Sequence, residues 1–208
     1  MSTAESSSEP LYARRTAAQL RQDRRRGIAA WREAVTLSEQ QPAGRESREA
    51  STEARRRLEA LQLTNATLER RAEGVALADT GTVRAVVVHR LEWMRERLAA
   101  GLSDHGIAVI GSEQDGAVAL GITIAEQPDL LVVEDRLPSV PAVELVRSLK
   151  LFAPSTLAAA QVEHPDAGEA LIEAGAAAVF SRRIPPQDVC AQLALCLRER
   201  PGDPLIVG

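Results

Sequence analysis

The 208-residue sequence is poor in aromatic residues, which make up only 2% of the chain, although 45% of its residues are hydrophobic. Its core must therefore be built from Ala, Leu and Val. Lysine is almost absent too, with Lys150 the only one, so arginine carries nearly all the positive charge. The net charge of -4 is modest and points neither to a general nucleic-acid binder nor to an acidic tail protein.

Cysteine is scarce, and the two present lie six residues apart at Cys190 and Cys196 on one predicted helix. Residues at this spacing point in different directions, so they cannot bridge within the helix. No Cys/His cluster has zinc-ligand spacing, so we expect two free thiols in a reducing cytoplasm. The sequence also lacks a signal peptide and any apolar run of about 18 residues, which predicts a soluble cytoplasmic protein without a membrane partner.

The composition changes near residue 80. Residues 11–80 are rich in Arg, Glu, Ala and Gln and favour two helices, over about 11–39 and 45–76. From residue 82 to 201, short Val/Ile/Leu runs alternate with amphipathic segments. We expect residues 1–10 to be disordered, a joint at 79–81, and a short tail over 202–208.

The second predicted helix carries an apolar heptad seam. Its members are spaced alternately four and three residues apart: Ala54, Leu58, Leu61, Asn65, Leu68, Ala72 and Val75. A lone Asn in such a seam often fixes register and a two-stranded state, because its amide is best satisfied by a partner helix. The seam predicts a homodimer through Leu58, Leu61, Asn65 and Leu68. The alternative is that it packs back on the first helix within the same chain.

Three consecutive arginines, Arg24 to Arg26, lie in the first predicted helix. A solvated helix face is the preferred interpretation, because Asp23 and Glu33 dilute the positive charge. Contact with nucleic acid, and so transcriptional control through this helix, is the alternative.

Five β-α units are predicted after residue 82. The strands cover 84–88, 107–111, 130–134, 155–160 and 177–181, and the helices 93–102, 116–126, 142–151, 167–174 and 186–198. This alternation predicts an α/β fold with a doubly wound, five-stranded parallel sheet. Its working edge should lie at the carboxyl ends of the strands.

Four stretches in this block resemble receiver domains of bacterial two-component response regulators. They are VVVHRLEWMRERL, IAVIGSEQDGAVAL, PDLLVVEDRLP and EAGAAAVFSRRIPP, and they match the family in order and spacing. The resemblance implies the flavodoxin-like receiver fold. It also implies an acceptor Asp four residues before a turn proline, which binds Mg²⁺ together with two acids after the first strand.

The residues at those positions depart from the family pattern. Counting back from Pro138 places Glu134 at the acceptor position, while Asp135 falls one residue late and on the opposite face of the strand. The other matched positions hold His89 and Arg90 for the two acids, Ala159 for a hydroxyl residue, Val179 for an aromatic and Arg182 for a lysine.

Neutral histidine is a poor ligand for Mg²⁺ and arginine is not a ligand, so we expect neither a metal nor a cofactor. Glu134 should instead pair with Arg90 or Arg182 in a charge-assisted hydrogen bond. The sequence thus predicts a non-enzymatic, receiver-like signalling protein that contacts protein partners without being phosphorylated. Three accounts of the pocket stay open: Glu134 mimics a phosphorylated acceptor, the pocket is inert, or its residues have drifted. A phosphorylation-competent regulator using Asp135 is a further alternative.

Overall fold

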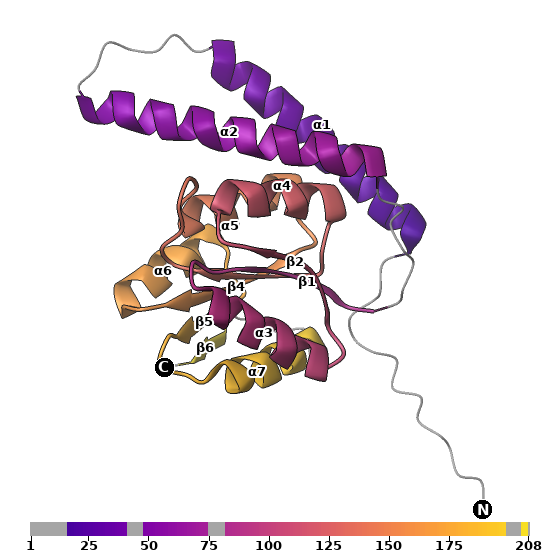
Figure 1. The fold of residues 1–208 in the computed structure, drawn as a ribbon, viewed down its shortest axis with the longest axis vertical. Coiled ribbons are helices and arrows are strands. Elements are labelled where there is room, and N and C mark those ends of the chain that lie inside the picture. The colour runs from indigo at the N-terminus through magenta and orange to yellow at the C-terminus, as the bar shows by residue number, and fades with distance from the viewer. Residues whose placement is uncertain (1–15, 41–47, 75–81, 199–204, 208) are drawn as a thin grey trace, which may run out of the picture.

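A computed structural model describes residues 16–40, 48–74, 82–198 and 205–207. The expectations for residues 1–10, for the joint at 79–81 and for Val75 lie outside these residues. The described part of the chain forms a parallel β-sheet with helices on both faces and an additional helical layer on one side (Figure 1). None of the described helices is both long enough and apolar enough to cross a membrane.

The sheet has six strands in the order β2-β1-β3-β4-β5-β6, and every neighbouring pair is parallel. Their bounds are β1 Arg84–Val88, β2 Ala108–Glu113, β3 Leu130–Glu134, β4 Leu157–Val162, β5 Ala178–Ser181 and β6 Leu205–Val207. The first five strands therefore confirm the doubly wound arrangement. β1 and β3 begin and end where predicted, whereas β4 lies two residues later than expected.

The sixth strand corrects the expectation of a simple tail over 202–208. Leu205, Ile206 and Val207 pair with Ala178, Val179 and Phe180 of β5 and extend the sheet at this edge. A Leu-Ile-Val run favours β structure, but three residues after a Pro- and Gly-containing segment give too short a pattern to predict a strand.

Helices cover both faces of the sheet. The bounds on one face are α3 Glu92–Asp104 and α7 Pro186–Arg198, and on the other α4 Gly116–Glu126, α5 Ala142–Phe152 and α6 Pro165–Ala174. Successive strand residues alternate between the two cores: Ala85 and Val87 pack toward α3 and α7, while Val86 and Val88 pack toward α4 and α5. Neither cysteine forms a disulfide bond, as expected, and burial raises the pKa of Cys190 to about 11.

The two N-terminal helices, α1 Ala17–Gln40 and α2 Arg48–Gly74, form a third layer outside α4 and α5. α2 runs along α4, and α1 crosses α2 and contacts α4 and α5. Trp31 of α1 packs edge-on against Phe152 of α5, with 5.2 Å between the ring centroids. Its indole Nε1 also donates to Oδ1 of Asn65 on α2 at 2.8 Å.

The predicted dimer seam is therefore used in large part within the chain. Leu68 is buried, Leu61 packs against the core, and the Asn65 amide finds its partner in Trp31 rather than in a second helix. Leu58 remains 51% exposed. The side chains of Ala54 and Ala72 lie outside the described part. The intrachain alternative expected the seam to pack on the first helix, but within the described part of the chain α2 docks mainly on α4 and meets α1 through Asn65 and Trp31. Pairing between two copies stays a prediction.

Candidate functional site

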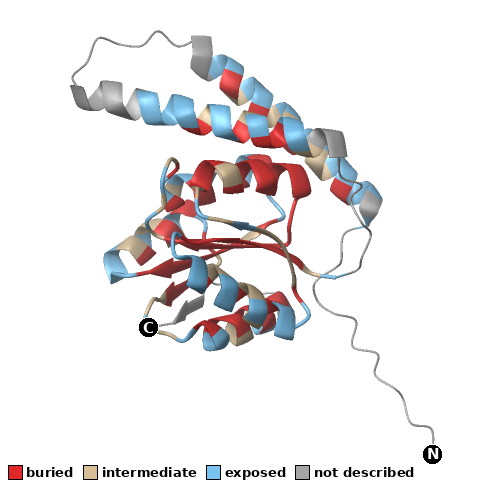
Figure 2. Cartoon of the chain, in the orientation of Figure 1, coloured by how far each residue is buried: buried red, intermediate tan, exposed pale blue. Residues whose placement is uncertain are grey.

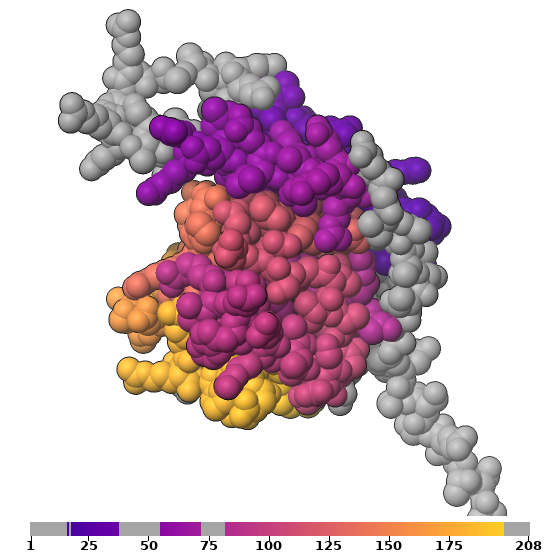
Figure 3. Space-filling model, viewed as in Figure 1, coloured from indigo at the N-terminus to yellow at the C-terminus, as the bar shows by residue number. Residues whose placement is uncertain are grey.

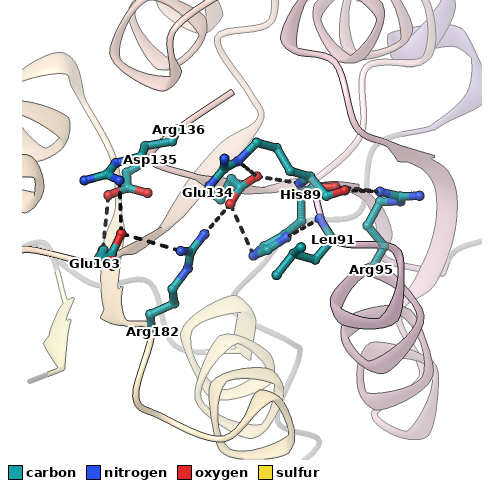
Figure 4. A network of polar contacts seen from close by, with 9 residues as sticks. His89, Leu91, Arg95, Glu134, Asp135, Arg136, Glu163 and Arg182 are labelled. Carbon is teal, nitrogen blue, oxygen red and sulfur yellow. Dashed lines mark hydrogen bonds and ion pairs between the residues drawn. The ribbon is translucent and has the colours of Figure 1, made fainter. Parts of the chain in front are cut away.

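Polar side chains from four neighbouring strands meet at the carboxyl edge of the sheet, on the side covered by α3 and α7 (Figure 4). Glu134 ends β3 on the same side as Leu130 and Val132, and His89 follows β1 on the side of Ala85 and Val87. Arg182 follows β5 directly.

Glu134 is completely buried and both of its carboxylate oxygens are occupied. Oε1 accepts from the backbone N–H of Arg90 and from its guanidinium Nε at 2.9 Å. Oε2 accepts from a terminal guanidinium nitrogen of Arg182. The predicted charge-assisted pairing is confirmed, and it involves both arginines at once. Two cations compensate one buried carboxylate, which removes the cost of leaving it unpaired.

His89 forms one wall of this pocket and is 1% exposed. Burial lowers the pKa of its imidazole, Arg182 and Arg90 lower it further, and Glu134 opposes them by raising it. Its Nδ1 accepts from the backbone N–H of Leu91 at 3.0 Å, so the neutral ring carries its proton on Nε2. Nε2 faces Glu134 Oε2 across 3.4 Å. Nε2 has no hydrogen-bond partner within the described part of the chain, and the neutral ring adds no third cation beside the two arginines.

Asp135 lies on the other side of the strand, as the alternation predicted. Its Oδ2 accepts from the backbone N–H of Glu163 at 3.1 Å, in the loop between β4 and α6. The Glu163 carboxylate contacts Arg136 at 3.3 Å and Arg182 at 3.7 Å. Arg182 therefore joins two networks, one around Glu134 and one around Glu163. Asp135 belongs to the second and is not an alternative occupant of the pocket.

Two of the matched positions differ from the expected site. Ala159 lies in the middle of β4, opposite Val132, and the residue opposite Glu134 is Gln161. The physical reason is that β4 ends at Val162, two residues beyond its predicted end. Val179 packs into the core on the α6 side, where its Cγ1 lies 3.1 Å from the position of a Cβ built on Gly168. It therefore lies on the opposite face of the sheet from Glu134.

The sequence pattern did not indicate three residues that contribute to this region: Gln161, Glu163 and Arg95. Gln161 is 2% exposed, and neither end of its amide has a hydrogen-bond partner within the described part of the chain. Arg95 donates to the backbone oxygens of His89 and Arg90 and so holds the loop that carries them. Of these three residues, only Gln161 had a signal in the sequence: it is a polar residue that directly follows three alanines, near the end of a predicted strand.

The pocket does not fit Mg²⁺, the ion that the resemblance implied. Magnesium requires hard oxygen ligands in octahedral geometry, and here the neighbouring groups are a neutral imidazole and two guanidiniums. The one carboxylate present is already saturated with donors. Among the described residues no three His, Cys, Asp or Glu side chains are grouped so that they could hold a metal ion.

No family model matches this chain, and no curated protein matches it. Solved structures do. The signal receiver domain of the response regulator NarL from Mycobacterium tuberculosis aligns with a TM-score of 0.54 and 23% identity, over 57% of this chain and 98% of that one. The isolated receiver domain of RcsB from Salmonella enterica serovar Typhimurium, with the phosphomimetic BeF3-, gives 0.54 and 13% over 61% and 94%. The response regulator domain of Thermotoga maritima CheB gives 0.51 and 19% over 56% and 94%.

These likenesses show a fold. The chain contains the α/β fold of a response-regulator receiver domain, with five parallel strands in the order 2-1-3-4-5, and its N-terminal helices precede this fold.

Proposed function

We propose that this chain is a receiver-fold signalling protein that acts through protein contacts and does not depend on phosphorylation. One observation carries the proposal. Glu134, at the end of β3, is fully buried, and its two oxygens accept from Arg90 and Arg182. The pocket is thus filled by an anion and its counter-cations, all of which belong to the chain itself.

This arrangement leaves phosphoryl transfer without its requirements. The reaction needs a free carboxylate as nucleophile and a metal ion to neutralise the charge that develops between two anions. Here the carboxylate is held by three donors, and Arg90 lies where an acidic ligand would be needed. A guanidinium neutralises charge permanently, so the state of the pocket does not depend on a phosphodonor. We expect binding rather than catalysis from such a site.

The ion pairs also bear on the three accounts of the pocket. Drift would leave a buried acid unpaired, and an unpaired buried charge costs several kcal/mol. The pairing of Glu134 with both arginines therefore supports a maintained, self-filled pocket over drift. Whether the filled pocket resembles a phosphorylated state or is simply inert depends on which partner it favours.

A phosphorylation-competent regulator that uses Asp135 is the second candidate. Asp135 is an aspartate at a strand end and is partly exposed, and its Oδ1 has no hydrogen-bond partner within the described part of the chain. Its other oxygen is engaged by the Glu163 N–H, and the Glu163 carboxylate is close by. Like charges at that position oppose a further anion.

Incubation of the full chain with a small phosphodonor and Mg²⁺, followed by intact-mass measurement, tests the proposal. We expect no phosphate adduct in the wild type or in Asp135→Asn. An adduct on the wild type that disappears in Asp135→Asn would replace this proposal with the second candidate. Glu163→Gln serves as a matched variant, since it removes the nearby charge and should raise any yield that depends on Asp135.

A further inference from the structure

α4 is apolar on both of its sides. Every residue from Gly116 to Glu126 is buried except Val118, whereas a helix on the surface of a two-layer domain normally presents one polar face to solvent. The outer side of α4 therefore needs a cover, and α2 and α1 supply it. Figure 2 shows α4 buried along most of its length beneath two helices that carry exposed residues on their outward sides, and Figure 3 shows α2 packed directly over it.

Close contacts fix the rotation of both covering helices. A Cβ at Gly121 of α4 would lie 2.8 Å from Thr67 Cβ on α2, and a Cβ at Gly27 of α1 would lie 2.4 Å from the Phe152 carbonyl oxygen. Thr64 Oγ1 donates to the Ala117 carbonyl at 2.9 Å. Near the end of α2, Arg71 contacts the buried Glu126 at 3.0 Å. The inner faces of α1 and α2 are thus committed to the domain.

Because the inner faces are fixed, the outward faces are fixed too, and they are basic. Among the described side chains of the two helices, the exposed charged residues are eight arginines and three glutamates: Arg21, Arg25, Arg26, Arg32, Arg55, Arg56, Arg57 and Arg70, with Glu33, Glu59 and Glu69. Glu59 is already paired with Arg55 at 3.2 Å. We call these eight arginines the basic layer.

The basic layer lies on an acidic body. Residues 82–198 contain fifteen Asp and Glu against ten Lys and Arg. On α1, Arg21, Arg25 and Arg32 are four and seven residues apart, so they lie along one side of the helix over about 16 Å. Over their full length α1 and α2 contain eleven arginines and eight Asp or Glu residues, so the helical layer has a net positive charge and the body a net negative one. A charge difference of this sign between two parts of a chain favours a polyanion at the positive part.

We propose that the basic layer binds the phosphate backbone of duplex DNA. A row of guanidiniums matches a regular row of phosphates, since arginine binds phosphate through paired hydrogen bonds and duplex DNA carries about one charge per 1.7 Å. The contact would be independent of base sequence. An anionic membrane fits less well, because insertion requires a broad exposed apolar helix face, and among the described side chains of α1 and α2 the large exposed hydrophobic residues are three leucines, Leu37, Leu58 and Leu63.

The test uses the full chain and a labelled 30-base-pair duplex of arbitrary sequence, with anisotropy titrations from 25 to 200 mM salt. Contacts with about three to five phosphates predict a four-fold rise in salt to weaken binding by about 40-fold to about 500-fold. Arg21→Gln/Arg25→Gln should weaken binding. It should also make the slope of log K against log salt shallower by the amount expected for about two lost phosphate contacts. The matched control, Arg97→Gln/Arg183→Gln, removes the same charge from the body and should leave the slope unchanged.

Three results would overturn the proposal. They are no binding at 25 mM salt, equal weakening by both double variants, or binding to anionic phospholipid vesicles in the absence of DNA binding. None of them affects the claim that Glu134 fills the pocket, which the phosphodonor experiment tests separately.

Discussion

At the scale of single residues, the candidate site depends on the partners of one buried carboxylate, that of Glu134. Glu134 differs from aspartate by one methylene, and that extension allows it to reach arginines on both β1 and β5 flanks. His89 contributes by staying neutral. A charged imidazole would add a third cation beside Arg90 and Arg182, and burial already disfavours that form.

The lowered pKa of His89 predicts how stability depends on pH. Since the unfolded chain binds this proton more readily than the folded one, the free energy of unfolding should fall as pH drops below about 6.5, the usual histidine value. The loss from one proton cannot exceed about 1.4 kcal/mol per pH unit. Urea unfolding from pH 8 to 5.5 should show a weaker pH dependence for His89→Gln than for wild type. The exposed His105→Gln is the control, and equal slopes in all three proteins would contradict the prediction.

At the scale of secondary structure, the parallel strands were predictable because they are short, continuous apolar runs. β1, β3, α4 and α7 have the predicted bounds. β4 was placed two residues early because its Ala-rich sequence has no sharp boundary, and this displaced the site residue from Gln161 to Ala159. The pairing of Glu134 followed from charge alone. Glu163 could not be predicted, because its role depends on how the loop after β4 folds back over β3.

The sequence of α4 indicates that a third layer of helices must cover it, although the overall composition does not. GAVALGITIA, in α4, has no polar face, and a helix of this kind must be covered on both sides. The covering helices were predicted, but their docking on α4 was not, since the heptad seam fitted a partner helix equally well. Tertiary packing placed the seam mainly on α4, a surface that the pattern did not single out.

Gly121 tests this docking directly. Gly→Ala in the middle of a helix normally stabilises by about 1 kcal/mol. Here the new Cβ would lie 2.8 Å from Thr67 Cβ and 3.1 Å from the Thr64 carbonyl oxygen. We therefore expect Gly121→Ala to lower the free energy of unfolding by about 1–3 kcal/mol, measured in urea. Stabilisation by Gly121→Ala would show open space at this position and contradict the docking of α2 on α4.

At the scale of the whole molecule, α1 and α2 are packed on the receiver-like part as its third layer rather than extending from it. The same packing leaves Leu58 exposed, so this part of the heptad seam of α2 is not covered by the rest of the described chain. A homodimer through this seam would have to use Leu58 and residues next to it, because Asn65 and Leu68 are engaged within the chain.

Light scattering on the full chain tests self-association. If the seam pairs two copies, the wild type should be a dimer and Leu58→Glu should be a monomer, since a charge at a seam position opposes pairing. Leu63→Glu is the matched control on the same helix: it is 39% exposed and lies off the seam. Monomers in all three proteins, or equal effects of both substitutions, would contradict the dimer.

Glu134 occupies an anion site formed by Arg90, Arg182 and His89. Glu134→Ala should lower the free energy of unfolding by about 2–4 kcal/mol, because it leaves two arginines without their shared partner. Formate or acetate should then bind in its place and raise the thermal midpoint of Glu134→Ala well beyond the effect of chloride at equal ionic strength. Wild type and Glu134→Ala/Arg182→Ala should not respond in this way. An equal response to carboxylate and chloride in Glu134→Ala would contradict the account.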